Sequence, residues 1–343
     1  MSRDEQPNWG ANEPGTATHE QTNRVPLLNR ANEPGTATHE QTNRVPLLNR
    51  ANEPGTATHE QTNRVPLLNR EAILVTKHEK ERVIKPILEE ATGCRLRVLE
   101  AFDTDKFGTF SREVKRKKSQ FETAKLKAKK GLRQAKGDLV VSSEGTFGMH
   151  PVIPMPWNVE LVYLFDRLNR VEIYGVHESS ETNFSHLEVQ NFRMLVSFAE
   201  RIGFPEHWLI LRPDGLDSKY VIKDIDDYDK LEEAYFKCAL KSRFGKIFVE
   251  TDMRAHANPT RMGNIKKATE HLVSRILSFC PKCSSPGFAV SRSIKGLPCG
   301  LCGLPSELVL RDVYTCPKCK HEEEKSRAGA TVAEPRYCHY CNP

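Results

Sequence analysis

The sequence has no apolar run near the ~20 residues that a helix needs to cross a bilayer. Its first ten residues, MSRDEQPNWG, are polar and contain no secretory signal. Charged residues make up 28% of the chain, which is hydrophilic throughout. These absences predict a protein of the cytoplasm that has no membrane partner. Nothing in the sequence indicates its oligomeric state.

Disulfides are not expected either, although the chain has 10 cysteines. Eight of them form Cys-x-x-Cys pairs, and in a chain without an export signal this spacing favours metal binding. Two such turns supply the four thiolates of a closed tetrahedral site, so the pairs predict two structural zinc ions. The predicted ligands are Cys280, Cys283, Cys299, Cys302, Cys316, Cys319, Cys338 and Cys341. Because a four-thiolate zinc site carries −2, two sites would lower the formal charge of +6 to about +2.

The four turns allow three pairings, which are sequential, nested and cross-braced. The stretch CGLCGLPSELVLRDVYTCPKC (299–319) resembles a complete zinc ribbon, which favours the nested scheme. The first two pairs also have ribbon spacing, which favours the sequential scheme. The sequence does not decide between them. Because so short a segment has a small core, we expect residues 278–343 to form a double zinc-ribbon domain that needs its metal to fold.

The N-terminal part consists of ANEPGTATHEQTNRVPLLNR repeated without change at 11–30, 31–50 and 51–70. No copy has the helical or strand periodicity that stacking repeats would bury. We therefore expect residues 1–70 to be a disordered tail. The alternative is a partner-binding motif around Val25-Pro26-Leu27-Leu28.

Residues 71–277 have the pattern of an α/β domain. A strand at 72–76, a helix and a second strand at 96–99 make a β-α-β opening, which predicts parallel strands. A β-hairpin follows over 161–176, with helices at 192–202 and 226–241 and strands at 207–211 and 247–249. We expect a mixed sheet flanked by helices.

The candidate site begins in the stretch from Phe121 to Gly148. Glu122 opens a predicted helix whose other face carries lysines, and Glu144 follows the next strand, where an α/β sheet usually presents its site. Two acids delivered to one end of a sheet beside lysines suit a metal-bound polyphosphate. In the loop before the helix, Asp103 and Asp105 are further candidate ligands for a hard cation. The excess of Lys and Arg over residues 112–136 favours phosphate binding, or else is a solvated helix face.

A second polar run, ETDMRAHANPTRMGNI, also follows a strand and leads into a helix near Pro259. A helix N-terminus is a ready anion site, and Arg254, His256 and Arg261 supply charge there. Alternatively, Glu250, Asp252 and His256 approach a metal.

The motif Glu122-Thr123-Ala124-x-x-Lys127-Ala128, followed by Glu144-Gly145, resembles the Glu-Asn-Ala-x-x-Lys-Ala helix and the acidic loop of the inosine/xanthosine triphosphate pyrophosphatases, the ITPase-like superfamily. Thr76-Lys77-His78-Glu79-Lys80 is similar to their opening Thr-x-Asn-Pro-x-Lys, although His78 replaces Asn and Glu79 replaces Pro. Thr260-Arg261 resembles the start of a late helix in a related phosphatase branch. The whole of 71–343 resembles an uncharacterised domain-of-unknown-function family, through ETDMRAHANPTRM and the terminal Cys-x-x-Cys-Asn-Pro.

The superfamily resemblance implies an ITPase-like fold and Mg²⁺-dependent hydrolysis of a nucleotide or a related phosphorylated compound at a phosphoanhydride. Glu122 and Glu144 would handle the metal or its water, and Lys80, Lys127 and Arg261 would bind phosphate, with Arg254 as a further candidate. The alternatives are a nucleic-acid-binding protein that uses the basic stretch and the zinc tail, and a docking protein whose core binds a ligand without turning it over.

Overall fold

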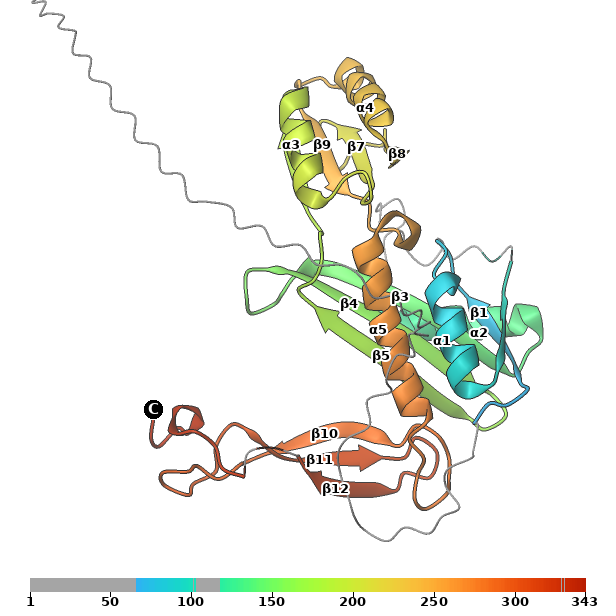
Figure 1. The fold of residues 1–343 in the computed structure, drawn as a ribbon, viewed down its shortest axis with the longest axis vertical. Coiled ribbons are helices and arrows are strands. Elements are labelled where there is room, and N and C mark those ends of the chain that lie inside the picture. Colours follow the sequence, from blue (N-terminus) through green and yellow to red (C-terminus); the bar gives the residue numbers. More distant parts are fainter. Residues whose placement is uncertain (1–65, 101, 103–117, 328, 330) are drawn as a thin grey trace, which may run out of the picture. The chain divides into compact units, whose positions relative to one another are not determined.

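The computed structural model describes residues 66–343 except 101, 103–117, 328 and 330 (Figure 1). The predictions made for residues 1–65, for Asp103 and Asp105, and for the part of the basic stretch at 112–117 lie outside the described residues. Within them, no helix combines the length and the apolar character needed to cross a membrane.

The first sheet is mixed and has the strand order β2-β1-β3-β4-β5 (Figure 1). Its strands are β1 (Glu71–Val75), β2 (Arg95–Val98), β3 (Leu139–Met149), β4 (Pro156–Asp166) and β5 (Val171–Ser179). β1 pairs in parallel with β2 and β3, whereas β3, β4 and β5 are antiparallel. The parallel pairs need crossovers, which α1 (Glu81–Thr92) and α2 (Gln120–Ala135) provide. The predicted β-α-β opening and hairpin are therefore confirmed.

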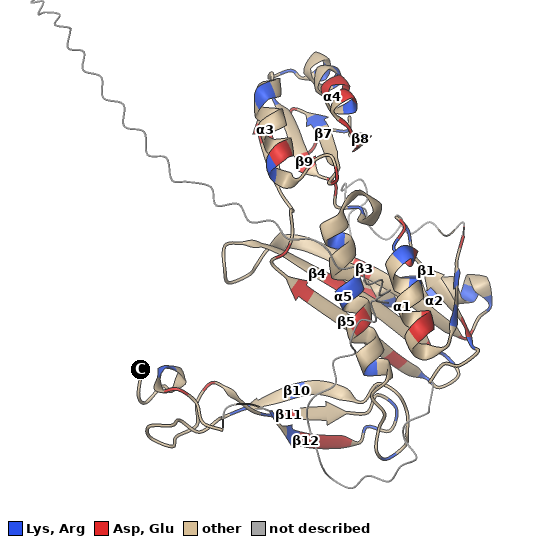
Figure 2. Cartoon of the chain, viewed as in Figure 1, with Lys and Arg blue, Asp and Glu red and all other residues tan. Residues whose placement is uncertain are grey.

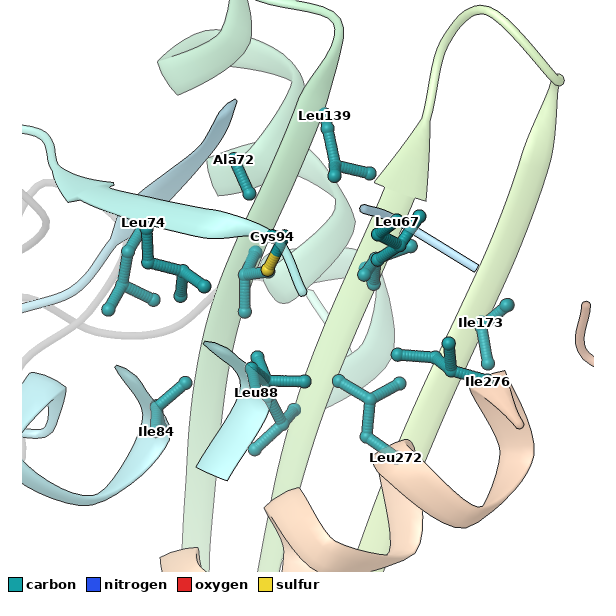
Figure 3. Packing of buried hydrophobic residues seen from close by; sticks show 14 of the residues in the cluster. Leu67, Ala72, Leu74, Ile84, Leu88, Cys94, Leu139, Ile173, Leu272 and Ile276 are labelled. Carbon is teal, nitrogen blue, oxygen red and sulfur yellow. The ribbon is translucent and has the colours of Figure 1, made fainter. Parts of the chain in front are cut away.

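Helices cover both faces of this sheet. Alternate residues of β1 face opposite sides, so Ala72 and Leu74 pack with α1 and α5 (Pro259–Ile276), whereas Ile73 and Val75 pack with α2. Figure 3 shows the first of these clusters. α5 begins where the sequence predicts, because Asn258 Oδ1 accepts the Arg261 backbone N–H at 2.9 Å and Pro259 occupies the first turn.

A second sheet has the order β6-β9-β7-β8. It is formed by β6 (His186–Val189), β7 (Leu209–Pro213), β8 (Ile222–Ile225) and β9 (Ile247–Thr251). α3 (Phe192–Ile202) and α4 (Tyr228–Lys241) pack on it through a separate apolar cluster. β9 leads through the short helix η2 (Ala255–Ala257) into α5, so the second polar run of the sequence links the second sheet to the helix that covers the first.

The last five residues of the repeat region are part of the folded core, and this corrects the prediction of a disordered tail as far as residue 70. Pro66 to Asn69 form a turn, and Leu67 is buried with 3% of its surface exposed. It joins the cluster beneath α1 and α5 (Figure 3). Leu68 is 57% exposed, so only one leucine of the apolar pair packs into the core just before β1.

The C-terminal region is built on a three-stranded antiparallel sheet in the order β10-β11-β12. Its strands are β10 (Ala289–Lys295), β11 (Val309–Thr315) and β12 (Glu322–Ser326), and the short helix η3 (Pro335–Tyr337) precedes the last cysteine pair. The turns that flank these strands contain the cysteines.

Candidate functional site

Five charged side chains from five different elements gather at one end of the first sheet, and all are nearly inaccessible to solvent. Lys80 precedes α1, and Lys127 lies on α2. Glu144 is on β3, Glu160 on β4 and Arg261 on α5, with exposed fractions of 4%, 1% and 1%. A buried charge is costly unless it is paired, so the pairing within this group determines what it can do.

The pairs divide between the two faces of the sheet. On the face covered by α2, Lys127 forms an ion pair with Glu144. On the opposite face, Arg261 Nε donates to Glu160 Oε1 at 2.9 Å and Lys80 Nζ donates to Ser143 Oγ at 3.2 Å. Strand alternation explains the division, because neighbouring residues of β3 point to opposite sides. We refer to these five charged residues as the buried charge cluster.

Lys80 is affected by every other member of this cluster. The pKa of Lys80 is lowered to about 7, mainly by burial, next by Arg261 and also by Lys127, whereas Glu160 and Glu144 act to raise it. All four groups therefore lie close enough to Lys80 for their charges to act on its ammonium. Near neutral pH Lys80 is therefore poised between its charged and neutral forms.

Gly145 lies beside the pair of Arg261 and Glu160, opposite Glu160 in the β3–β4 ladder. A Cβ added there would be 2.6 Å from both Arg261 Nη2 and Glu160 Oε1, so any other residue would push the ends of these two side chains aside. Arg261 also donates to the backbone oxygen of Met253 and lies with Cζ 5.1 Å from the centre of the Phe147 ring.

Glu160 is a member of the cluster that the sequence pattern does not predict. A glutamate inside an apolar hairpin strand is ordinarily assigned to the solvent side of the sheet. The available signal is the glycine in the facing strand, but strand register is needed to pair the two residues. In the structure, Glu160 also accepts from Asn158 Nδ2 at 3.2 Å.

Glu122 does not join the buried charge cluster, contrary to the sequence prediction. It is exposed on α2. Five residues separate it from Lys127, which turns it about 140° around the helix axis. Gln120, two turns before Lys127 and on the same face, takes that place and donates from Nε2 to the backbone oxygens of Glu144 and Val159, both at 2.8 Å.

The acids of the second polar run are held by arginines rather than arranged around a metal. Asp252 is fully buried and accepts from Arg254 Nε at 3.0 and 2.9 Å, while Arg254 Nη2 donates to Asp224 at 2.7 Å. Glu250 pairs with Arg212 at 2.8 Å. Glu250, Asp252 and His256 do not converge on one point, so the alternative of a metal there fails. That Arg254 binds phosphate stays a prediction.

His256 instead lies beside the loop before α1. Its ring centre is 5.2 Å from that of His78 and 5.3 Å from that of Trp208. Burial, with Lys80 next in importance, lowers the pKa of His78 to about 2. Burial, followed by the charge of Arg254, also lowers the pKa of His256. Both imidazoles are therefore neutral at physiological pH and border the cluster without adding charge to it.

The eight predicted cysteine ligands form two groups, as expected in number, and the pairing is cross-braced. Cys280, Cys283, Cys316 and Cys319 make one group, and Cys299, Cys302, Cys338 and Cys341 make the other. Sulfur–sulfur distances of 3.6 to 3.8 Å join them across the pairs. Four thiolates about 2.3 Å from a tetrahedral zinc lie roughly 3.8 Å apart, so this donor set fits zinc, whereas disulfides would need about 2 Å.

The strands explain this pairing. Each of β10, β11 and β12 carries the chain from one end of the small sheet to the other, and seven residues of strand span about 23 Å. Consecutive cysteine pairs therefore fall at opposite ends, so pairs one and three share a site, as do pairs two and four. Of the three pairings that the sequence leaves open, the structure therefore has the cross-braced one. No other group of three or more His, Cys, Asp or Glu ligands converges in the described part of the chain.

Comparison with known proteins identifies a family but no activity. Residues 127–343 match the family described as "Domain of unknown function (DUF6671)". No curated protein matches the chain. Among solved structures, the chain is similar to a PelC dodecamer from Paraburkholderia phytofirmans, with 14% identity over 32% of this chain and 70% of that one, and a TM-score of 0.18. The ITPase-like resemblance is not found by these comparisons and stays a prediction.

Proposed function

Because this chain belongs to the DUF6671 family, which is defined by a domain of unknown function, we propose a function from the site alone. The buried charge cluster binds a nucleotide or another phosphorylated small molecule, and the protein hydrolyses a phosphoanhydride bond of that ligand.

The observation that carries this proposal is the convergence of buried charged groups. Among the described residues, Lys80, Lys127 and Arg261 lie together with Glu144 and Glu160, and the largest exposed fraction among the five is 8%. The pKa of Lys80 is lowered to about 7, mainly by burial and next by Arg261. A phosphate group placed beside Lys80 would favour its protonated form.

Each residue has a distinct role in this proposal. Lys80 and Lys127 donate to phosphate oxygens and stabilise the charge that builds up there during hydrolysis. Arg261 is oriented by Glu160 and by the Met253 carbonyl, so it meets a ligand without first losing rotamer freedom. Neutral His78 and His256 lie at the border of the cluster, where an imidazole nitrogen can accept a hydrogen bond from the attacking water.

A magnesium ion fits this site only in part. Glu144 is the one member of the predicted acid pair within the cluster, and Glu160 is engaged by Arg261 on the opposite face of the sheet. Mg²⁺ is commonly held by one or two carboxylates together with substrate phosphates and water, so Glu144 would hold an ion that arrives with a polyphosphate. Such an ion would neutralise phosphate charge.

The test is a panel of nucleotides and sugar phosphates, with and without Mg²⁺, measured by thermal shift and by release of phosphate or pyrophosphate. We expect at least one compound to raise the melting temperature and to be hydrolysed. Lys80→Met should lower the affinity for that compound at least tenfold. Lys129→Met, which changes an exposed lysine of α2, should leave the affinity unchanged. If no compound binds, the proposal is wrong. Binding without release would reduce the function to ligand sensing.

A second candidate function is nucleic acid binding, favoured by the outer end of α2. A cavity of about 290 Å³ there is lined by Arg133, Lys136 and Arg167 together with Leu132 and Gly137. Figure 2 shows Lys and Arg in blue along α2. Phosphate contacts give an affinity that falls steeply with salt. Arg133→Gln combined with Lys136→Gln should then reduce the salt slope by about two. A slope that the double variant leaves unchanged would exclude this surface.

A further inference from the structure

The segment Pro66-Leu67-Leu68-Asn69-Arg70, which ends the third repeat, occupies a defined slot on the core. Leu67 inserts its side chain into the apolar cluster that includes Cys94 and Leu139 (Figure 3). Arg70 holds the carboxylate of Asp166 with two hydrogen bonds, one of them 3.0 Å long. An apolar anchor and a charged anchor three residues apart thus fix a short peptide.

The backbone of the segment completes the slot. A helix ends with carbonyl groups that have no partner within the helix. At the end of α1, the Leu67 N–H donates to the Thr92 oxygen at 3.2 Å and the Asn69 N–H donates to the Gly93 oxygen at 2.9 Å. Gly93 has φ of +68°, a left-handed conformation that turns its carbonyl away from the helix. The slot therefore contacts the backbone of the segment as well as its leucine and arginine side chains.

The folded core holds the Asp166 carboxylate in place and in its charged form, where Arg70 can bind it. It is 3% exposed, and its carboxylate also accepts from the Asn169 backbone N–H at 3.1 Å and from Asn169 Nδ2 at 2.8 Å. Despite burial, which raises it, the pKa of Asp166 lies below its ordinary value, because Arg70 and Asn169 stabilise the charged form. Emptying the slot would leave this charge without its cationic partner.

The same five residues occur twice more in the chain, at 26–30 and 46–50. From this identity we propose that the slot is a binding site for the repeat unit, and that residues 46–50 occupy it whenever 66–70 leave it. The repeats are thus alternative intramolecular ligands for one site on the core. Identical side chains make identical contacts, so only the connecting chain distinguishes the copies.

The length of that connection sets the order of preference. When 46–50 are bound, the 20 residues up to position 70 form a loop that returns to β1. The probability of closing a loop falls as its length to the power 3/2, so this state is disfavoured by about 90-fold relative to direct attachment. Residues 26–30 would be disfavoured by about 250-fold. The third copy therefore holds the slot in the native chain, and the second is its replacement.

The experiment compares three variants of the full chain at saturating zinc. The first has Leu67→Ala and Arg70→Gln. The second carries the corresponding changes in both upstream copies, at positions 27, 30, 47 and 50. The third combines all of them. The folding equilibrium constant is measured by urea denaturation, and hydrogen exchange at Arg95, whose backbone N–H donates to the Arg70 oxygen at 2.8 Å, reports slot occupancy.

We expect the first variant to lose no more than about 90-fold in the folding constant, because the second copy takes over. The upstream changes alone should have no effect. The combined variant should lose more than about 300-fold, from the lost leucine and the unpaired Asp166. Equal losses in the first and combined variants would overturn the proposal.

A second measurement covers the case in which the combined variant does not fold. The peptide RVPLLNR is then added to the first variant and to the same variant with Leu47→Ala. The proposal requires a larger rise in melting temperature in the latter, in which fewer internal copies compete, and no rise with the control peptide RVPALNR. Equal effects of the two peptides would refute sequence recognition by the slot.

Discussion

Glu160→Gln tests whether the buried pair with Arg261 organises the candidate site. Both side chains are 1% exposed, and 2.9 Å separates Arg261 Nε from Glu160 Oε1. Replacing the carboxylate with an amide removes the negative charge to which the buried guanidinium donates. Removing one partner of a buried pair costs about 3–5 kcal/mol. We expect a loss of that size in the free energy of unfolding, measured by urea denaturation at saturating zinc.

The matched control is Glu172→Gln in the adjacent strand. Its ion pair with Lys125 has side chains 32% and 27% exposed, and such pairs contribute about 0–1 kcal/mol. A third variant, Glu160→Leu with Arg261→Met, removes both charges and should recover most of the stability. If Glu160→Gln costs no more than Glu172→Gln, the reasoning about the buried charge cluster is refuted.

Three further predictions concern the site and the zinc module. The pKa of Lys80 is about 7 in the folded state, against an ordinary value of 10.5, so the unfolded chain binds more protons between these two pH values. The free energy of unfolding should therefore rise with pH across this window, by up to about 1.4 kcal/mol per pH unit. Lys80→Met should flatten that rise in urea titrations at a series of pH values. Cross-bracing requires that Cys280→Ser with Cys316→Ser keeps one zinc by elemental analysis, whereas Cys280→Ser with Cys299→Ser keeps none; sequential or nested pairing would leave no zinc in the first variant. Gly145→Ala places a methyl 2.6 Å from both groups of the buried arginine–glutamate pair, so overpacking should cost about 1–3 kcal/mol and weaken the ligand, and an unchanged melting temperature would contradict this.

Local sequence patterns indicate which segments of the chain contribute to the site, but not which individual side chains meet there. Arg261 is identified from its place near a helix start, and Glu144 from a predicted strand end, although β3 in fact continues to Met149. Lys80 and Lys127 are identified through the resemblance to the ITPase-like superfamily. Glu122 is assigned to the same site because it opens the helix, yet its angle around the helix axis directs it elsewhere. Glu160 is missed, because its partner Arg261 lies 101 residues away in the chain.

The repeats also show that local sequence patterns do not predict which segments join the folded core. Composition and the absence of periodicity predict disorder for every copy alike, because the three copies are identical. Only the third copy directly precedes β1, and that position lets Leu67 and Arg70 reach the end of α1 and Asp166. A local pattern cannot report a difference that arises only from the strand and helix beside it.

The amino-acid sequence by itself determined the features that depend on short spacings. These are the cysteine turns that fit two metal ions, the alternation of strands and helices, and the start of α5 at Asn258 and Pro259. The tertiary structure alone decided which cysteine turns share an ion, which acids meet the buried cations, and which repeat joins the core. Each of these outcomes depends on strand register or strand direction, which brings together residues far apart in the chain. Local sequence preferences act only between neighbouring residues, so they do not specify such long-range pairs.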